Sequence, residues 1–474
     1  MPAKSVYAAL LLAATLVLTG CLGVRSERAP GKVAVWSTSA DGSRKLAQMP
    51  DLMLEPASDE AGIVEVDPAQ RYQAIVGFGA GMTDTSAEVL FGTKDAAIRD
   101  ALFAELFAPN QLNLSFLRLP IGASDFSREH YSLADRPAGQ TGLKSFSMTR
   151  AGPQIAATLA ALRHNPDLVL MASPWSAPAW MKTNDSLITG KLAPAHYADF
   201  AAYFDRYLTE MRKAGLPVRY VSVQNEPHFE PTNYPGMRVD PASRAAFIGG
   251  HLGPLLARKH PGTAILDWDH NWDEAASPLT VLSDPAARRY IAGVAWHCYA
   301  GDVAAQSQVR DAHPDKDVFF TECSGGGWAP KWGETLGWMT ENLIIGSSRH
   351  WSRATLLWNL ALNENGGPHN GGCGNCRGVV TIDSNSGAIT RNVEYYVLGH
   401  AARFVRRGAR RVASNQTNSI LNVAFHNPDG SLVMIAFNKS ARSEQLRVRQ
   451  KSTGFNLILP PGEVVTLVWN KSDQ

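Results

Sequence analysis

The feature that most constrains the fold is a strand-then-helix alternation along most of the chain. Eight short apolar runs each end in polar or small residues, at 74–79, 115–119, 168–173, 220–224, 264–268, 294–297, 318–321 and 355–359. Longer segments between them carry apolar residues at three- and four-residue spacing, at 96–107, 153–163, 197–213, 244–258 and 336–345. Eight strand-helix units close naturally into a (β/α)₈ barrel. An open doubly wound sheet is the alternative, but no Gly-x-Gly-x-x-Gly fingerprint follows the first run.

The pattern changes after a last helix expected at 392–405. Alternating strands are predicted at 419–425, 432–438, 444–448, 455–459 and 464–469, separated by turn signals. Two runs before the barrel, 32–37 and 63–67, have no barrel role, so we expect them to join the C-terminal strands in one β-sandwich. The predicted organisation is N-terminal strands at 33–70, the catalytic barrel at 71–405 and the C-terminal sandwich at 406–474.

The first residues predict export rather than fold. Lys4 precedes an apolar run at 6–18, and the sequence LTGC ends at Cys21, which resembles a bacterial lipoprotein signal. This implies a signal peptide at 1–20, lipidation of Cys21 and a tether at 21–32; an ordinary cleaved signal peptide is the alternative. We expect an exported bacterial protein held by this anchor to a membrane, on its periplasmic or cell-surface face.

Composition and cysteine use limit the partners. The formal net charge of +2 gives no general attraction to nucleic acid. Export permits disulfides among the four remaining cysteines. Cys373 and Cys376 are predicted to form a local disulfide in a glycine-rich loop rather than a metal half-site or a redox pair, since no second Cys-x-x-Cys is present. Cys298 and Cys323 are either thiols or a bridge.

Active sites of such barrels lie at the carboxyl ends of the strands, where this chain is rich in polar and aromatic side chains. The candidates are Met82, Thr83, Asp84, Arg118, Asp125, Trp175, Asn225, Glu226, Asp269, His270, Asn271, His297, Tyr299, Glu322, Trp358 and Asn359. Glu226 and Glu322 follow the fourth and seventh apolar runs. Glycoside hydrolysis needs one protonated and one ionised carboxyl, and side chains across a barrel mouth can approach to about 5 Å, the separation of the retaining mechanism.

The other candidates suit a sugar. Trp175 and Trp358 offer flat apolar faces for a pyranose ring, although tryptophans in a barrel more often serve packing. Asp84, Asn225 and His297 offer hydrogen bonds to hydroxyls, and Arg118 is suited to hold a carboxylate ionised. We expect Tyr299 and Asn359 to bind substrate as well.

Several stretches in order resemble glycoside hydrolase family 30, the glucosylceramidase family. They are GFGAGMTD at 77–84, LRLP at 117–120, SDFS at 124–127, ASPWSAPAWMKTN at 172–184, QNEP at 224–227, WHCY at 296–299, TE at 321–322 and WNLALN at 358–363. The resemblance implies a barrel with a side β-domain, Glu226 as acid/base, Glu322 as nucleophile and Asn225 on the 2-hydroxyl. Asp84, Trp175 and Trp358 would line the glucose subsite.

The implied reaction is retaining hydrolysis of a β-D-glucoside, which needs no cofactor and no metal. The glycine-rich loop after Asn363 departs from the animal glucosylceramidases and is similar to loops in bacterial and fungal branches, some of which cut β-1,6-glucan. Glycolipid and β-1,6-glucan, cut by endo or exo attack, are therefore both candidate substrates, and xylan is a weaker one. Other classes are a lipoprotein that binds carbohydrate without cutting it, and a redox or metal protein built on Cys373 and Cys376.

Overall fold

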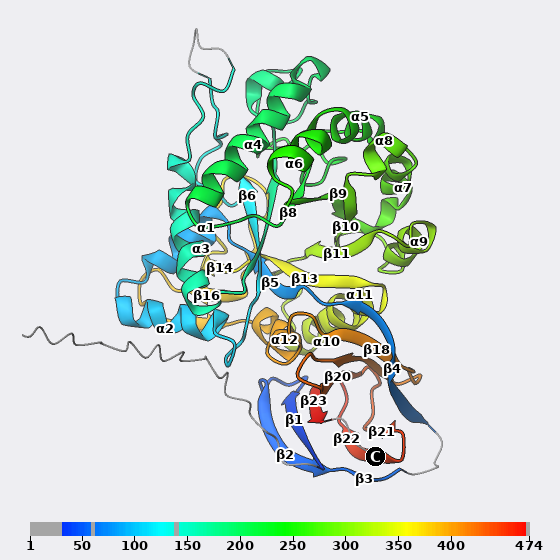
Figure 1. Cartoon of the computed structure of the whole chain (residues 1–474). Coiled ribbons are helices and arrows are strands. Elements are labelled where there is room, and N and C mark those ends of the chain that lie inside the picture. Colours follow the sequence, from blue (N-terminus) through cyan, green and yellow to red (C-terminus); the bar gives the residue numbers. More distant parts are fainter. Residues whose placement is uncertain (1–30, 58–61, 137–141, 471–474) are drawn as a thin grey trace, which may run out of the picture.

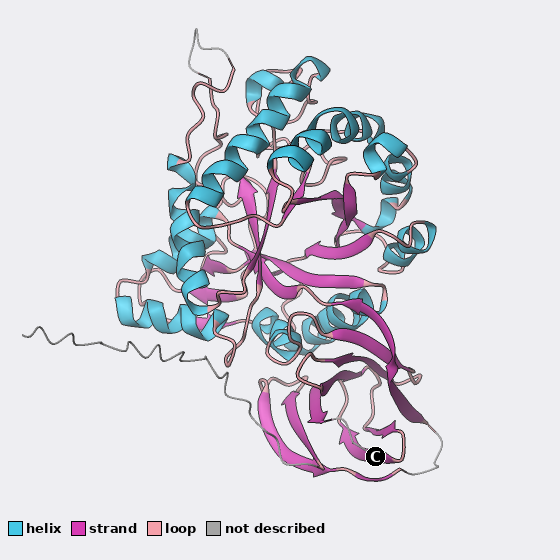
Figure 2. Ribbon diagram, in the orientation of Figure 1, coloured by secondary structure: helices cyan, strands magenta, loops and turns pink. Residues whose placement is uncertain are grey.

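A computed structural model of the chain describes residues 31–57, 62–136 and 142–470. The expected signal peptide and Cys21 lie outside the described residues. The described part folds into a barrel and a β-domain that lies beside it, next to α10 and α12 (Figures 1 and 2). Helices surround the barrel strands, and the β-domain consists of strands alone in this view.

The predicted (β/α)₈ barrel is confirmed. Eight strands pair in parallel around a closed ring, in the order β10-β11-β13-β5-β6-β7-β8-β9. Their bounds are β5 Gly77–Gly81, β6 Phe116–Ile121, β7 Val169–Pro174, β8 Tyr220–Ser222, β9 Ala264–Asn271, β10 Ile291–His297, β11 Asp317–Glu322 and β13 Ser352–Asn359. Rings of Phe116, Tyr220 and Phe319 pack together inside the barrel, with centroids 4.8 to 6.4 Å apart. These residues fill the barrel interior, as in other packed barrels of this type.

Helices cover the outside of the ring (Figure 2). They are α1 Asp84–Gly92, α2 Ala96–Phe107, α3 Gly152–His164, α4 Tyr197–Lys213, α5 Pro241–Phe247, α6 Gly253–Lys259, α7 Ala276–Leu282, α8 Pro285–Arg288, α9 Ala305–Ala312, α10 Trp332–Met339, α11 Ser347–Arg349 and α12 Val393–Ala402. Two of the predicted helices contain wider π-helical turns, at Ile248–Leu252 and Thr340–Gly346. Sequence periodicity at three and four residues does not distinguish such a turn from a continuous α-helix.

The β-domain combines both chain ends, as predicted. One ten-stranded sheet has the order β2-β1-β23-β20-β19-β18-β4-β21-β22-β3. The strands are β1 Lys32–Thr38, β2 Ala47–Met53, β3 Glu55–Pro56, β4 Ile63–Ala74, β18 Arg410–Ser414, β19 Ile420–His426, β20 Ser431–Asn438, β21 Glu444–Gln450, β22 Thr453–Leu459 and β23 Val464–Asn470. Sequence patterns did not predict β2, β3 or β18. Residues 71–74, expected to begin the barrel, instead extend β4, in which Arg71 and Ala74 pair with β18.

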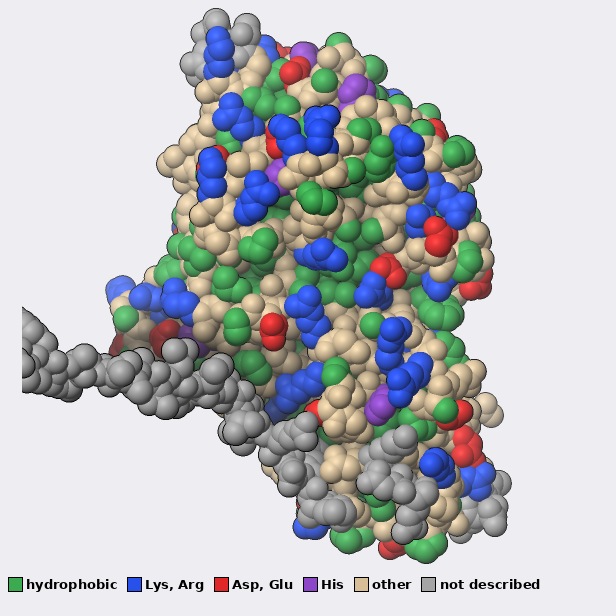
Figure 3. Space-filling view, viewed as in Figure 1, with side chains coloured by type: hydrophobic (Ala, Val, Ile, Leu, Met, Phe, Trp, Pro, Cys, Tyr) green, Lys and Arg blue, Asp and Glu red, His purple; other side chains and the backbone are tan. Residues whose placement is uncertain are grey.

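Short strands pair with one another in the loops that follow β11 and β13. β14 Ala361–Asn363, β16 Val380–Ile382 and β17 Ile389–Arg391 form one small sheet, and β12 Gly325–Gly326 pairs with β15 Cys376–Arg377. On the face shown in Figure 3, basic and acidic side chains are interspersed over both domains. No helix among the described residues has the length and apolar character needed to cross a bilayer.

Candidate active site

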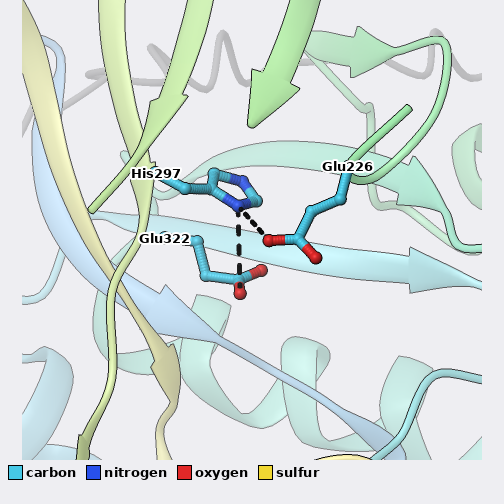
Figure 4. A group of neighbouring side chains, drawn as sticks. All are labelled: Glu226, His297 and Glu322. Atoms are coloured by element: carbon cyan, nitrogen blue, oxygen red, sulfur yellow. Dashed lines mark hydrogen bonds and ion pairs between the residues drawn. The ribbon is translucent and has the colours of Figure 1, made fainter. Parts of the chain in front are cut away.

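Two carboxyls and one imidazole meet where the barrel strands end. Glu322 is the last residue of β11, His297 is the last residue of β10, and Glu226 follows β8. One oxygen of each glutamate and one ring nitrogen of His297 all lie within 4.8 Å of one another. Figure 4 shows the three side chains pointing toward a common centre. The structure therefore brings together the two glutamates that the sequence separates by almost a hundred residues.

The backbone at Glu226 adopts an uncommon conformation. Its φ is +48°, and that of Asp269, two residues before the end of β9, is +57°. Residues with a Cβ rarely occupy this region, and such backbone strain often marks functional sites. The Glu226 amide donates to the Asp269 carbonyl over 3.0 Å, which joins the two strained segments.

The buried carboxylate of Asp269 contacts Arg118 and His297, the two basic residues that lie against the glutamates. Its Oδ2 accepts hydrogen bonds from Arg118 Nη2 at 2.8 Å and from two serines of β7 and β8. Its Oδ1 accepts from His297 Nε2 at 3.1 Å and from Thr321 Oγ1 at 2.7 Å. These donors and the Arg118 charge outweigh burial and hold the pKa of Asp269 well below its ordinary value. The sequence indicates only that Asp269 lies at a strand end and predicts no role for it.

Glu322 is held by two groups that remain donors at neutral pH. Arg118 Nη1 lies 2.5 Å from Glu322 Oε2, and the Tyr299 hydroxyl donates to Glu322 Oε1 over 2.9 Å. Loss of water around the Tyr299 hydroxyl, which contacts Glu322, and the nearby carboxylates raise the pKa of Tyr299 well above 10, so the phenol stays protonated although part of the side chain is exposed. Arg118 and Tyr299, both expected at the site, thus contact the same carboxyl.

Charges around the two glutamates act in opposite directions. Burial alone raises both pKa values, because each carboxyl loses water. At Glu226 the His297 hydrogen bond and the cationic neighbours outweigh burial, and the pKa falls. At Glu322 burial, with the repulsion of Glu226 and Asp269, outweighs His297 and Arg118, and the pKa rises. The two carboxyls and His297 are close enough that the charge on each affects proton binding by the others, so the three groups titrate together.

His297 carries that proton. Burial opposes its charge, but Glu322, Asp269 and Glu226 raise the pKa of His297 to about 9. Neighbouring His270, 3.9 Å from Glu226, has a pKa lowered by burial to about 4 and is neutral at pH 7. Glu226, His297 and Glu322 also have the spacing of metal ligands. At neutral pH, however, the charges of His297 and Arg118 disfavour a cation there.

The aromatic candidates lie against Arg118. Trp175 and Trp358 stack on each other with centroids 4.7 Å apart and planes at 20°, and both are buried. The Arg118 guanidinium lies 4.8 Å from the Trp175 ring centre. Asn225 Oδ1 accepts a hydrogen bond from Arg118 Nη2 over 2.7 Å. This contact orients the side-chain amide of Asn225, whose NH₂ group is the end that can donate to a substrate. The two indoles thus pack one face against each other, which the sequence did not indicate.

Asp84 and Asn359 make their contacts elsewhere. Asp84 begins α1, and its Oδ2 accepts from the Ser127 hydroxyl at 2.7 Å and the Tyr131 hydroxyl at 2.8 Å. Asn359 Oδ1 accepts from Thr83 Oγ1 at 2.9 Å, and its Nδ2 has no hydrogen-bond partner among the described residues. Asp84 therefore joins the start of α1 to the segment after β6, and Asn359 joins the end of β13 to the residue before α1.

Asp125 is the acidic neighbour that sequence reasoning undervalued. It is buried, and the nearby charges of Glu322 and Glu226 help burial to raise its pKa to about 8. A hydrogen bond from Trp358 acts in the opposite direction. The sequence places Asp125 just past a predicted strand, in the stretch SDFS, but does not indicate that it lies among the sugar-binding side chains. Its proximity to both glutamates depends on how the loop after β6 folds back over the barrel.

Both cysteine pairs form disulfides. Cys373 joins Cys376 in the glycine-rich loop, and Cys298 joins Cys323 with 5.4 Å between their Cα atoms. The glycine-rich loop packs against the loop after β6: a Cβ at Gly372 would lie 2.4 Å from the Asp125 Cβ, and the Asn370 amide donates to the Asp125 carbonyl over 2.8 Å. This loop therefore forms a wall beside Asp125.

The chain matches known proteins along nearly all of its length. The family model for the glycosyl hydrolase family 30 TIM-barrel domain matches residues 75–405, and the model for the family 30 β-sandwich domain matches residues 408–467. An endo-1,6-β-D-glucanase of Aspergillus fumigatus is 31% identical over 475 residues, 93% of this chain and 94% of the relative. The mouse lysosomal acid glucosylceramidase is 28% identical over 440 residues, 86% of this chain and 84% of the relative.

A solved endo-β1,6-glucanase structure superposes with a TM-score of 0.85 at 29% identity, covering 94% of this chain and all of that one. The paired glutamates at the barrel mouth and the β-domain built from both chain ends agree with these matches. The chain belongs to glycosyl hydrolase family 30.

Proposed function

We propose that this enzyme hydrolyses β-1,6-linked glucan with retention of configuration, using Glu322 as the nucleophile and Glu226 as the acid and then the base. The observation that carries the proposal is the approach of oxygens of Glu226 and Glu322 to within 4.8 Å. Carboxyls roughly 5 Å apart suit direct attack on the sugar, whereas inverting enzymes keep a wider gap for water. The arrangement therefore favours a covalent glycosyl-enzyme intermediate.

Glu226 must be protonated for the first step, whereas in the free site charged His297 contacts Glu226 Oε1 through Nδ1 over 3.1 Å and helps to lower the pKa of Glu226. Bound sugar must therefore raise the pKa of Glu226, by excluding water from the carboxyl pair. Once Glu226 is neutral, its repulsion of Glu322 ends. Glu322 then faces the Arg118 guanidinium, which favours its ionised form.

The two half-reactions use the same pair. Glu322 attacks the anomeric carbon while Glu226 protonates the leaving oxygen, which yields a glycosyl ester on Glu322. Ionised Glu226 then takes a proton from water as the water attacks the same carbon, and Glu322 is released. The Asn225 NH₂ group and Asp125 are suited to hold sugar hydroxyls during both steps.

The substrate is tested by product analysis. Supplied with β-1,6-glucan, glucosylceramide and xylan side by side, the protein is expected to turn over β-1,6-glucan fastest and to release the β-anomer first, followed in real time by NMR. The similarity to endo-1,6-β-D-glucanases over 93% and 94% of the chain supports this order. Release of the α-anomer first would contradict the double displacement. Preferential cleavage of glucosylceramide, the substrate suggested by the mouse relative, would replace the glucan proposal.

We also propose that the enzyme acts at a membrane surface through lipid on Cys21. The sequence LTGC before and at this position supports the proposal. In a bacterial host, the wild type is expected to incorporate radiolabelled palmitate and to sediment with membranes, while Cys21→Ser abolishes the label. Equal label in both proteins would exclude Cys21 as the lipidation site.

A further inference from the structure

The disulfide between Cys298 and Cys323 lies one residue beyond two members of the active site. Cys298 follows His297 at the end of β10, and Cys323 follows Glu322 at the end of β11. Cys323 is buried in the core between barrel and helices, and Cys298 packs against that core. Side chains alternate along a strand, so the disulfide lies on the outer face while His297 and Glu322 face the barrel mouth. The bridge therefore does not line the sugar site.

The strand pairing explains why these two cysteines meet. β10 and β11 pair in parallel through Trp296 opposite Phe320, and the next pair is His297 opposite Glu322. Thr321 is passed over, which is a β-bulge, and its hydroxyl donates to Asp269. Cys298 lies opposite Cys323 only in this shifted register. Without the bulge, Cys298 would lie opposite Glu322, so the disulfide joins two residues that the shifted register brings opposite each other.

The shifted register aligns three consecutive residues with the proposed nucleophile. His297 Nδ1 lies 4.0 Å from Glu322 Oε1, the Cys298 sulfur is bonded to Cys323, and the Tyr299 hydroxyl donates to Glu322 Oε1 over 2.9 Å. Tyr299 is past the end of β10 and is 45% exposed; its backbone N–H donates to Asn271 Oδ1 over 3.0 Å, and its side chain follows the bend that begins at Cys298. β-Bulges commonly re-aim side chains beside active sites.

We propose that the Cys298–Cys323 disulfide is a positioning device of the catalytic centre, which fixes the bulged register and thereby holds Tyr299 and His297 on Glu322. The inference rests on the proposed role of Glu322. If the disulfide has this role, kcat depends on a bond that does not contact the substrate. Such a dependence suits an enzyme expected to work in an oxidising compartment, where disulfides persist.

The test is a double-mutant cycle between the disulfide and Tyr299. Removing the bond in C298A/C323A is expected to lower kcat about tenfold with KM nearly unchanged, the effect of weakening one hydrogen bond to a charged group. Tyr299→Phe is expected to have a similar effect. Combined, the changes should lower kcat by clearly less than about a hundredfold, because the Tyr299 contact that both changes remove can be lost only once.

The matched control removes the other disulfide, in C373A/C376A. Whatever effect C373A/C376A has on kcat, we expect the fold-changes of C373A/C376A and Tyr299→Phe to multiply when the variants are combined. The glycine-rich loop that carries Cys373 and Cys376 does not hold Tyr299, so the two effects are independent. A wild-type kcat in C298A/C323A, or multiplication of its effect with Tyr299→Phe, would overturn the proposal. If C298A/C323A shows no cooperative thermal unfolding, dithiothreitol-treated wild type and Tyr299→Phe proteins carry the same comparison, with thiols at Cys298 and Cys323 counted by alkylation and mass spectrometry.

The outcome is separable from the proposed function. The oxidised wild type is assayed first on β-1,6-glucan, and the cycle is then measured on whichever β-glycoside it cleaves. Absence of β-1,6-glucan turnover would refute the substrate proposal alone. Multiplicative effects in an active enzyme would refute the positioning role alone.

Discussion

Replacing Glu322 by Gln is expected to reduce kcat on β-glucosides by about 10⁴-fold or more, the scale on which a hydrolase loses activity without its nucleophile. The amide keeps the size and the contact with Tyr299 but cannot form a stable glycosyl ester. Substrate affinity should persist, because the groups suited to hold the sugar, such as Asn225 and Asp125, remain. Initial rates and equilibrium binding of a glucan oligosaccharide measure the two effects separately.

A matched control is Glu334→Gln, a highly exposed glutamate on α10 that pairs with Lys331. It should keep wild-type kcat, since it removes the same charge outside the site. A mechanism-based 2-deoxy-2-fluoroglucoside is expected to label the wild type at Glu322 and to leave Glu322→Gln unlabelled. Substantial turnover by Glu322→Gln, or covalent label on another carboxyl, would refute the nucleophile assignment.

Replacing Glu226 by Ala is expected to separate substrates by their leaving groups. On β-1,6-glucan, whose alkoxide leaves poorly, kcat/KM should fall by about 10²–10⁴-fold, the usual contribution of a general acid. On a 2,4-dinitrophenyl β-glucoside, kcat/KM should stay within about tenfold of the wild type, because this leaving group needs no proton. Since kcat/KM reports the first half-reaction, steady-state kinetics on the two substrates is the measurement.

Added azide gives an independent readout for Glu226→Ala. Azide needs no base to attack the glycosyl-enzyme, so it should raise kcat of the variant and yield a β-glucosyl azide, while the wild type is unaffected. Glu230→Ala, a change at an exposed glutamate four residues further on, is the control and should behave as the wild type. Equal losses of kcat/KM on both leaving groups would assign the acid role to another residue.

The barrel and the location of the glutamates were predictable because both depend on local sequence. Apolar runs of four to eight residues separated by amphipathic segments favour strand-helix units, and eight such units close a ring. A glutamate just past an apolar run must then lie at the carboxyl end of the ring. Glu226 and Glu322 satisfy this rule whatever the details of the loops.

The choice between Asp84 and Asp125 illustrates what local pattern does not decide. Both follow early barrel strands and look equivalent in the sequence. Asp84 is turned to Ser127 and Tyr131, whereas Asp125 is buried near both glutamates, because the loop after β6 folds back and packs against the glycine-rich loop. The strand β18 was missed for a related reason: its pairing with β4 joins residues more than three hundred positions apart.

By itself, the sequence determined the repeating units, the two domains made from three segments and the strand ends that carry the chemistry, since these follow from hydrophobic period and turn residues. Only the tertiary structure decided the register of β10 against β11, the pairing of Cys298 with Cys323 and the five hydrogen bonds to the Asp269 carboxylate. These features depend on a one-residue bulge and on side chains from strands far apart in the chain. No local pattern records such contacts, because they exist only once the ring has closed.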